Sequence, residues 1–86
     1  MVNIASKYAC TLADIPSGGQ ARVLELADGF ESYERQRLID LGVVPGTQVT
    51  VRNASAMGGL RAYKLRGTVL GLRHAQASRI HVEAVV

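Results

Sequence analysis

The chain has 86 residues, which suffice for one small domain and are too few for most enzymes with a deep catalytic cleft. Hydrophobic residues make up 48% of it, so the composition favours a packed core over disorder. The net charge of +3 does not by itself indicate a nucleic-acid partner. The single cysteine, Cys10, excludes an internal disulfide and a cysteine-cluster metal site.

The charge is unevenly distributed along the chain. Residues 1–42 hold four basic and six acidic residues, whereas residues 43–86 hold six basic residues and one acid. The two halves therefore carry −2 and +5, which predicts one electropositive face.

The N-terminal part predicts an extension, residues 1–10, followed by a single domain, residues 11–86. It has no apolar run of signal-peptide length, and nowhere does the chain approach the roughly 20 apolar residues of a membrane helix. We therefore expect a soluble, cytoplasmic protein.

Within the domain, Thr11-Leu12 favours a short strand, and residues 15–19 are typical of a turn because proline and glycine cluster there. Residues 20–27 predict a strand with apolar side chains on both faces, as in a small barrel that is covered on its outside.

A helix is predicted over residues 31–41. Asp28 is the expected N-cap, with Glu31 at the spacing of a capping box, and Gly42 is expected to end the helix. Glu31 and Arg35 have the spacing of a favourable ion pair along a helix.

One side of this helix is predicted to pack on the barrel. Its apolar arc holds Phe30, Tyr33, Leu38 and Leu41, and Arg37 falls inside that arc. We expect the stem of Arg37 to pack on the barrel while its guanidinium bonds carbonyl groups or a carboxylate.

The second half predicts further short strands. Pro45-Gly46 is typical of a type II turn, and residues 48–52 alternate polar with apolar side chains. Strands are expected over residues 61–66 and 68–72, joined around Gly67, then one helical turn within residues 73–78 and a final strand over residues 79–86. Five or six short strands with one helix predict a mainly β protein curled into a small barrel.

No arrangement of residues predicts catalysis. The chain lacks the glycine-rich motifs that hold phosphates, and Cys10 has no basic cluster beside it to activate the thiol. His74 and His81 lack a third converging ligand, so we expect neither a catalytic residue, a metal site nor a cofactor. Direct binding of a transition-metal ion by these histidines remains as an alternative hypothesis.

Two patterns indicate binding. The glycine-rich loop of residues 54–60 carries Met57 and Leu60, which either form an apolar docking patch or plug one end of the barrel. Tyr63 stands among basic residues, an arrangement also found in small barrels that bind single-stranded nucleic acid. Such a basic groove would be formed by Arg52, Arg61, Lys64, Arg66, Arg73 and Arg79.

Three segments resemble the FeoA family. The run from Arg37 to Thr47 is similar to the signature R-L-x-x-L-G-[LIV]-x-P-G-[ST] of that family. The opening segment from Thr11 to Gly18 resembles the start of the family pattern. The segment from Leu70 to Arg73, followed by Ala77, Ile80 and Val82, resembles its end.

This resemblance implies an SH3-like barrel with one inserted helix. It further implies a non-catalytic, cytosolic accessory protein of bacterial ferrous iron uptake, whose partner is a FeoB-type membrane transporter with a cytosolic G-protein domain. Nucleic acid is not the expected partner, and exposed strand edges favour self-association. We expect the partner to be contacted by Met57, Leu60, Arg61, Arg37 and Tyr63.

Overall fold

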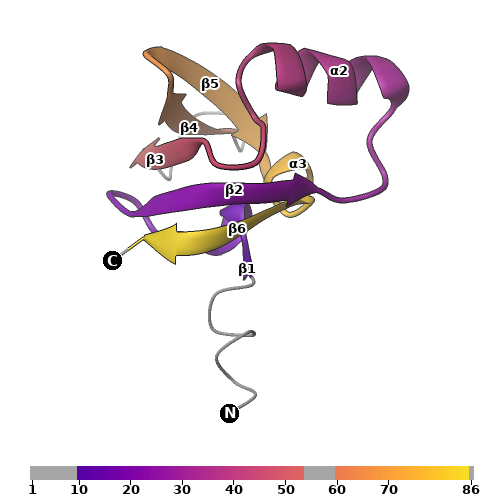
Figure 1. The fold of residues 1–86 in the computed structure, drawn as a ribbon. Helices are drawn as coiled ribbons and strands as arrows, with labels where there is room; N and C mark the ends of the chain where they lie inside the picture. Colours follow the sequence, from indigo (N-terminus) through magenta and orange to yellow (C-terminus); the bar gives the residue numbers. More distant parts are fainter. Residues whose placement is uncertain (1–9, 54–59, 86) are drawn as a thin grey trace.

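A computed structural model describes residues 10–53 and 60–85 of the chain (Figure 1). The predicted patch residue Met57 and the last strand residue, Val86, lie outside these described residues. In chain order, the elements are β1 (Cys10–Thr11), the 3-10 helix η1 (Leu12–Asp14), β2 (Gln20–Leu26), α2 (Ser32–Asp40), β3 (Gln48–Asn53), β4 (Leu60–Leu65), β5 (Thr68–Arg73), α3 (His74–Ala77) and β6 (Ile80–Val85).

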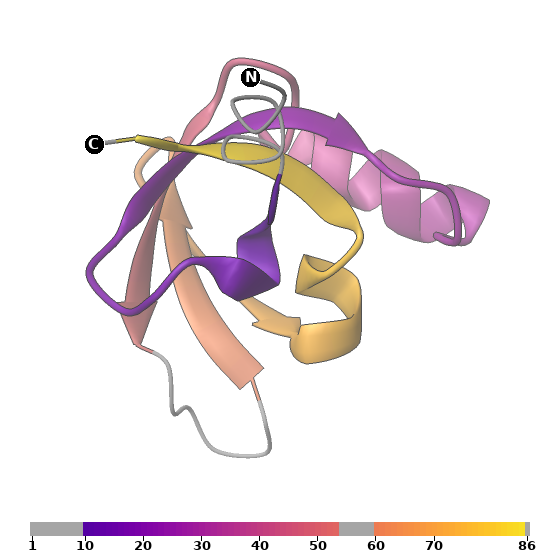
Figure 2. The same cartoon turned by 90° about the horizontal axis from the view of Figure 1, so that it is seen from below.

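The six strands form one antiparallel sheet in the order β1-β6-β2-β3-β4-β5. The sheet curls around a core, and η1 and α3 lie on the same side of the curl, in contact with each other (Figure 2). Short antiparallel strands bury more apolar surface when they curl than in a flat sheet of the same length. The prediction of a mainly β fold with an inserted helix is confirmed.

The burial of β2 differs from the prediction. Ala21 and Val23 are buried, whereas Arg22 and Leu24 on the opposite face are exposed, Leu24 at 40%. The prediction of burial on both faces is therefore wrong, because an antiparallel sheet can pack one face on its core and leave the other to water.

Helix α2 begins later than predicted. Glu31 is the N-cap residue, and Asp28 instead stands in a turn with Gly29, whose φ of +113° favours glycine. The helix nevertheless ends as predicted, because Gly42 follows it with a φ of +106°. Arg35 does not pair with Glu31, since its Nη2 donates to the Ala27 carbonyl at 2.8 Å.

The turns and strands after α2 follow the prediction. The Thr47 N–H donates to the Val44 carbonyl at 3.1 Å and Gly46 has a φ of +94°, as a type II turn requires. Strand β3 buries the two valines that alternate with its polar residues. Arg66 and Gly67 both have positive φ and form the two-residue turn between β4 and β5.

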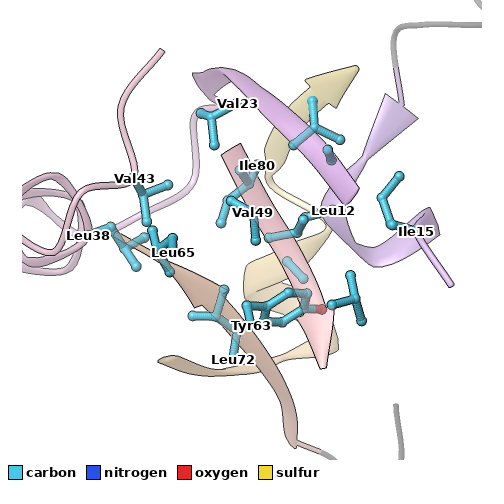
Figure 3. Close-up of a cluster of buried hydrophobic side chains, with 14 residues drawn as sticks. Leu12, Ile15, Val23, Leu38, Val43, Val49, Tyr63, Leu65, Leu72 and Ile80 are labelled. Atoms are coloured by element: carbon cyan, nitrogen blue, oxygen red, sulfur yellow. The ribbon is translucent and has the colours of Figure 1, made fainter. Parts of the chain in front are cut away.

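The core is built from aliphatic side chains and one tyrosine (Figure 3). Helix α2 contributes one buried residue, Leu38, which lies with Val43 and Leu65 at one end of the core (Figure 3). The predicted apolar arc of the helix is therefore only partly used: Tyr33 is 76% exposed, and Leu41 is half-buried. The remaining face of α2 is free to border a groove.

Candidate docking surface

A groove of about 370 Å³ separates helix α2 from strand β5. Its walls come from these two elements, and single residues of β4 and α3 complete them. The lining residues are Tyr33, Glu34, Arg37, Leu38, Leu41, Leu60, Leu70, Gly71, Leu72, Arg73 and Gln76.

The helical wall follows from the spacing of its residues. Tyr33, Arg37 and Leu41 stand four residues apart, so their side chains lie one above the other on a single face of the helix. Leu38 lies beside them and anchors the helix in the core. The anchored helix thereby presents a face that is apolar at its two ends and basic in the middle.

The opposite wall is mainly apolar. Leu70 and Leu72 of β5 contribute to it, and Leu60 stands at the start of β4, 37% exposed. Leu60 thus extends the apolar surface of this wall to the border of the groove.

Polar contacts hold the two walls together at one end of the groove. The Gln76 amide of α3 donates from Nε2 to Glu34 of α2 at 2.8 Å. Its Oε1 accepts the N–H of Arg73 at 3.0 Å. Gln76 therefore links α2 to the end of β5, and the side chains of Arg37 and Arg73 are left exposed at the rim.

The structure brings together two of the residues predicted to bind a partner. Arg37 and Leu60 are 23 positions apart in the sequence and line the same groove. The role predicted for Arg37, bonding carbonyl groups beside the barrel, belongs to Arg35, and the prediction for Arg37 is wrong in that respect. Arg37 instead carries its charge to the rim of the groove.

Arg61 and Tyr63 lie on the inner face of β4, away from this groove. Arg61 donates to the carbonyl of Ala13 at 3.1 Å and to that of Ile15 at 2.6 Å. Its guanidinium stands 5.7 Å from the centroid of the Tyr63 ring. Because Tyr63 is 1% exposed, its ring is part of the core and not of a surface that a partner meets in the folded domain.

Burial also removes the stacking platform of the nucleic-acid hypothesis. Tyr63 was the aromatic residue expected to stack on bases among the basic side chains, and it is enclosed. The basic residues Arg52, Lys64, Arg66, Arg73 and Arg79 are exposed and keep the C-terminal half electropositive.

The candidate nucleophile and metal ligands do not form one site, since Cys10 pairs with Val82 in β6, beside His81, whereas His74 is on α3. Burial raises the pKa of the Cys10 thiol, and the nearby negative charge of Asp14 raises it further, so the reactive thiolate is disfavoured. His74 is exposed on α3, and His81 is half-buried on β6. Within residues 10–53 and 60–85, no three His, Cys, Asp or Glu side chains converge as metal ligands.

Sequence reasoning identified two residues of the groove and missed its shape. The spacing of Tyr33, Arg37 and Leu41 is a usable signal for one helix face, but it does not show whether that face packs on the barrel or borders a groove. The second wall had no signal, because only the order of the strands places β5 at the end of the sheet beside α2.

None of the helices described by the structure has the length and apolar character that a membrane span requires.

Comparison with known proteins gives consistent results. A family model described as the FeoA domain matches residues 10–84. No curated protein matches the chain.

Among solved structures, the FeoA-like protein from Clostridium acetobutylicum is 29% identical with a TM-score of 0.76, over 92% of this chain and 90% of that one. The FeoA protein from Chlorobium tepidum is 29% identical with a TM-score of 0.79, over 88% and 70%. FeoA from Stenotrophomonas maltophilia is 28% identical with a TM-score of 0.71, over 85% and 88%. That last protein was solved with zinc, and it is described as an SH3 domain protein and suggested to activate ferrous iron transport.

The family match extends over nearly all of the described residues, and the three solved structures match 85–92% of this chain with TM-scores of 0.71–0.79. The signature from Arg37 to Thr47 has a structural explanation, since it contains the anchor Leu38, the helix-ending Gly42 and the turn at Pro45-Gly46. The chain therefore belongs to the FeoA family, which is implicated in ferrous iron transport.

Proposed function

We propose that this chain is a non-catalytic, cytoplasmic accessory protein of bacterial ferrous iron uptake that docks on the cytosolic side of a FeoB-type membrane transporter. The groove between α2 and β5 is the docking surface. The observation that carries this proposal is the joint lining of one groove by the exposed Leu60, the exposed Tyr33 and the rim residue Arg37.

The chemistry of the groove supports binding over catalysis. Apolar side chains form most of its surface. Its titratable residues are Tyr33, Glu34, Arg37 and Arg73, and Glu34 is bonded to Gln76. A groove with an apolar floor and a charged rim resembles the centre and border of a protein interface. The exposed basic residues of the C-terminal half would orient the domain beside an anionic membrane leaflet, where each contributes about 1 kcal/mol.

The test is binding of the purified chain to the cytosolic domain of a FeoB-type transporter, measured by biolayer interferometry. We expect Leu60→Asp to weaken binding by at least about tenfold, because it places an unpaired carboxylate against apolar side chains of the interface. The control is Leu24→Asp, since Leu24 is exposed to a similar degree and lies outside the groove.

Equal loss in both variants would point to a general effect on folding or solubility. Undiminished binding by Leu60→Asp, with the variant folded, would remove the groove from the proposal. Absence of any binding by the wild-type chain would contradict the proposed function itself.

A further inference from the structure

Strand β5 borders the groove with its edge rather than with a face. The four consecutive residues from Leu70 to Arg73 all line the groove. Because side chains alternate between the two faces of a strand, four consecutive residues can line one groove only along the strand's edge. Strand β5 is also terminal in the sheet, with β4 as its single neighbour among the described strands.

The turn between β4 and β5 determines which backbone groups point to this edge. A two-residue turn is closed by a pair that exchanges both hydrogen bonds, here Leu65 and Thr68, and the pattern then alternates. Leu70 and Leu72 accordingly bond to β4, whereas Val69, Gly71 and Arg73 direct their N–H and C=O groups to the free edge. The Arg73 N–H fits this parity, since it donates to Gln76 Oε1 outside the ladder.

Val69 and Gly71 retain their free groups. No backbone or side-chain group within residues 10–53 and 60–85 bonds to the outward N–H or C=O of either residue. Val69 and Gly71 stand two positions apart, and every second residue of a strand forms the backbone hydrogen bonds to a given neighbouring strand. The sheet thus offers a short pairing edge along the β5 wall of the groove, where Gly71 is a lining residue and Val69 lies just beyond the lining.

The edge is open around Gly71. A Cβ added at Gly71 would meet Leu60 Cδ1 at 3.9 Å, an ordinary contact, and no other atom within 4 Å. Helix α2 stands on the far side of the groove, so a chain that pairs with β5 would be enclosed between backbone and helix.

The shape and charge of the groove select the occupant. In a second copy of this chain, the β5 edge is itself bordered by α2, so the two edges could not approach each other closely. A single extended segment, by contrast, fits between β5 and α2. The apolar walls suit an apolar side chain. Arg37 and Arg73 at the rim suit acidic neighbours, since the one acid of the lining, Glu34, is bonded to Gln76. Residues 60–73 contain no acidic residue and three exposed basic ones, Lys64, Arg66 and Arg73, which adds to this preference.

We propose that the β5 edge binds an extended partner segment as an additional strand, with apolar residues facing the groove and acidic residues flanking them. Such strand addition takes affinity from backbone hydrogen bonds and specificity from alternate side chains. The proposal specifies how the docking surface binds, and it rests on the proposed function only for the identity of the partner.

The test uses the full chain and a blocked peptide of sequence Asp-Val-Thr-Leu-Thr-Val-Asp, with a control peptide that carries Lys at both ends. We expect the acidic peptide to bind at least about tenfold more tightly than the basic one. Hydrogen exchange followed by NMR should show new protection of the Val69 and Gly71 amides, with Leu70 and Leu72 already protected in the free protein.

Two variants of Gly71 separate pairing from packing. Gly71→Pro removes a free donor without breaking a bond to β4, and we expect it to weaken peptide binding about tenfold or more. Gly71→Ala keeps the donor and should bind within about twofold of wild type. If Gly71→Pro does not fold, hydrogen exchange of the Val69 and Gly71 amides in the wild-type chain, with and without the acidic peptide, decides whether the edge pairs with the peptide.

Absence of acidic-peptide binding, equal binding by Gly71→Pro, or unchanged exchange at Val69 and Gly71 would overturn the strand-addition proposal. The transporter experiment is independent of this one. Transporter binding without strand addition would remove only this inference, and peptide binding without transporter binding would remove only the proposed function.

Discussion

Arg61 connects two distant segments of the chain. Arg61 is a residue of β4, and its guanidinium donates hydrogen bonds to the carbonyls of Ala13 and Ile15, near the start of the domain. Hydrogen bonds from a charged donor to partly buried carbonyls are stronger than neutral ones, and their removal leaves the acceptors without a partner. Arg61 therefore stabilises the domain, although its position in a basic segment suggested a role in binding.

We expect Arg61→Met to lower the free energy of unfolding by about 2–4 kcal/mol, because two carbonyl groups lose a charged donor. The control is Lys64→Met on the same strand, whose exposed side chain should contribute less than about 0.5 kcal/mol. Urea denaturation followed by circular dichroism measures both. Similar effects of the two substitutions would contradict the structural role of Arg61.

Tyr63 is a second residue with a structural role. Its Oη is buried and bonds to no group in the described part of the chain. Burial raises the pKa of Tyr63 above its ordinary value of 10.0, while the nearby positive charge of Arg61 opposes the rise. The folded state consequently holds this proton more tightly than the unfolded state does.

This difference predicts the direction of a pH effect. Below about pH 10 the phenol is protonated in both states, so its titration does not affect stability. Above that pH the unfolded state releases the proton first, and the free energy of unfolding declines. We expect Tyr63→Phe to remove this part of the alkaline decline and to raise stability at pH 7 by about 1 kcal/mol, since the buried hydroxyl is lost. Chemical denaturation at pH 7 and above pH 10 tests both statements, and a marked loss at pH 7 would show that Oη has a hydrogen-bond partner.

At the scale of elements, the end of α2 is fitted to the turn between β4 and β5. Gly42 follows the helix with positive φ, and the side chain of Arg66 from the turn lies where a Cβ of residue 42 would be. The helix end and the turn therefore depend on one small residue.

We expect Gly42→Ala to lower the free energy of unfolding by about 1–3 kcal/mol, through backbone strain and collision with Arg66. In the variant Arg66→Asn, the asparagine tolerates the positive φ at residue 66, and the long arginine side chain is absent. In that background, Gly42→Ala should retain the strain and lose the collision, so the double-mutant cycle should show coupling. Additive effects, measured by thermal and urea denaturation, would contradict the contact.

At the scale of the whole molecule, charge separates the two halves of one small domain. The acidic residues concentrate in residues 1–42, whereas the C-terminal half carries five exposed basic residues, of which Arg73 lines the groove; they are Arg52, Lys64, Arg66, Arg73 and Arg79. Charges at the border of an interface act mainly on the rate of association and on orientation. The apolar groove would then determine how long the complex persists.

We expect the association rate with the transporter's cytosolic domain to fall several-fold between about 50 and about 300 mM NaCl, because salt screens exposed charges. The dissociation rate should change little. Lys64→Glu should flatten the salt dependence, and Leu60→Asp should act chiefly on dissociation. A rate that is independent of salt would show that the basic half does not steer binding.

Local chemistry determined much of this protein from its sequence. The type II turn at Pro45-Gly46, the end of α2 at Gly42 and the alternation in β3 were predicted correctly, because each depends on φ preferences or on side-chain period within a few residues. The family signature was recognisable for the same reason, since its residues form a helix end and a turn. The sequence also predicted Arg37 and Leu60 as binding residues, and the structure brings both to one groove.

Tertiary structure alone decided the rest. Tyr63 is enclosed and Tyr33 is exposed, although both are tyrosines near basic residues, because β4 turns one toward the core and α2 contacts the core only through Leu38. The groove exists because strand order leaves β5 at the end of the sheet opposite α2. Periodicity specifies which side chains of an element share a face, but which neighbour covers that face depends on contacts between residues far apart in the chain.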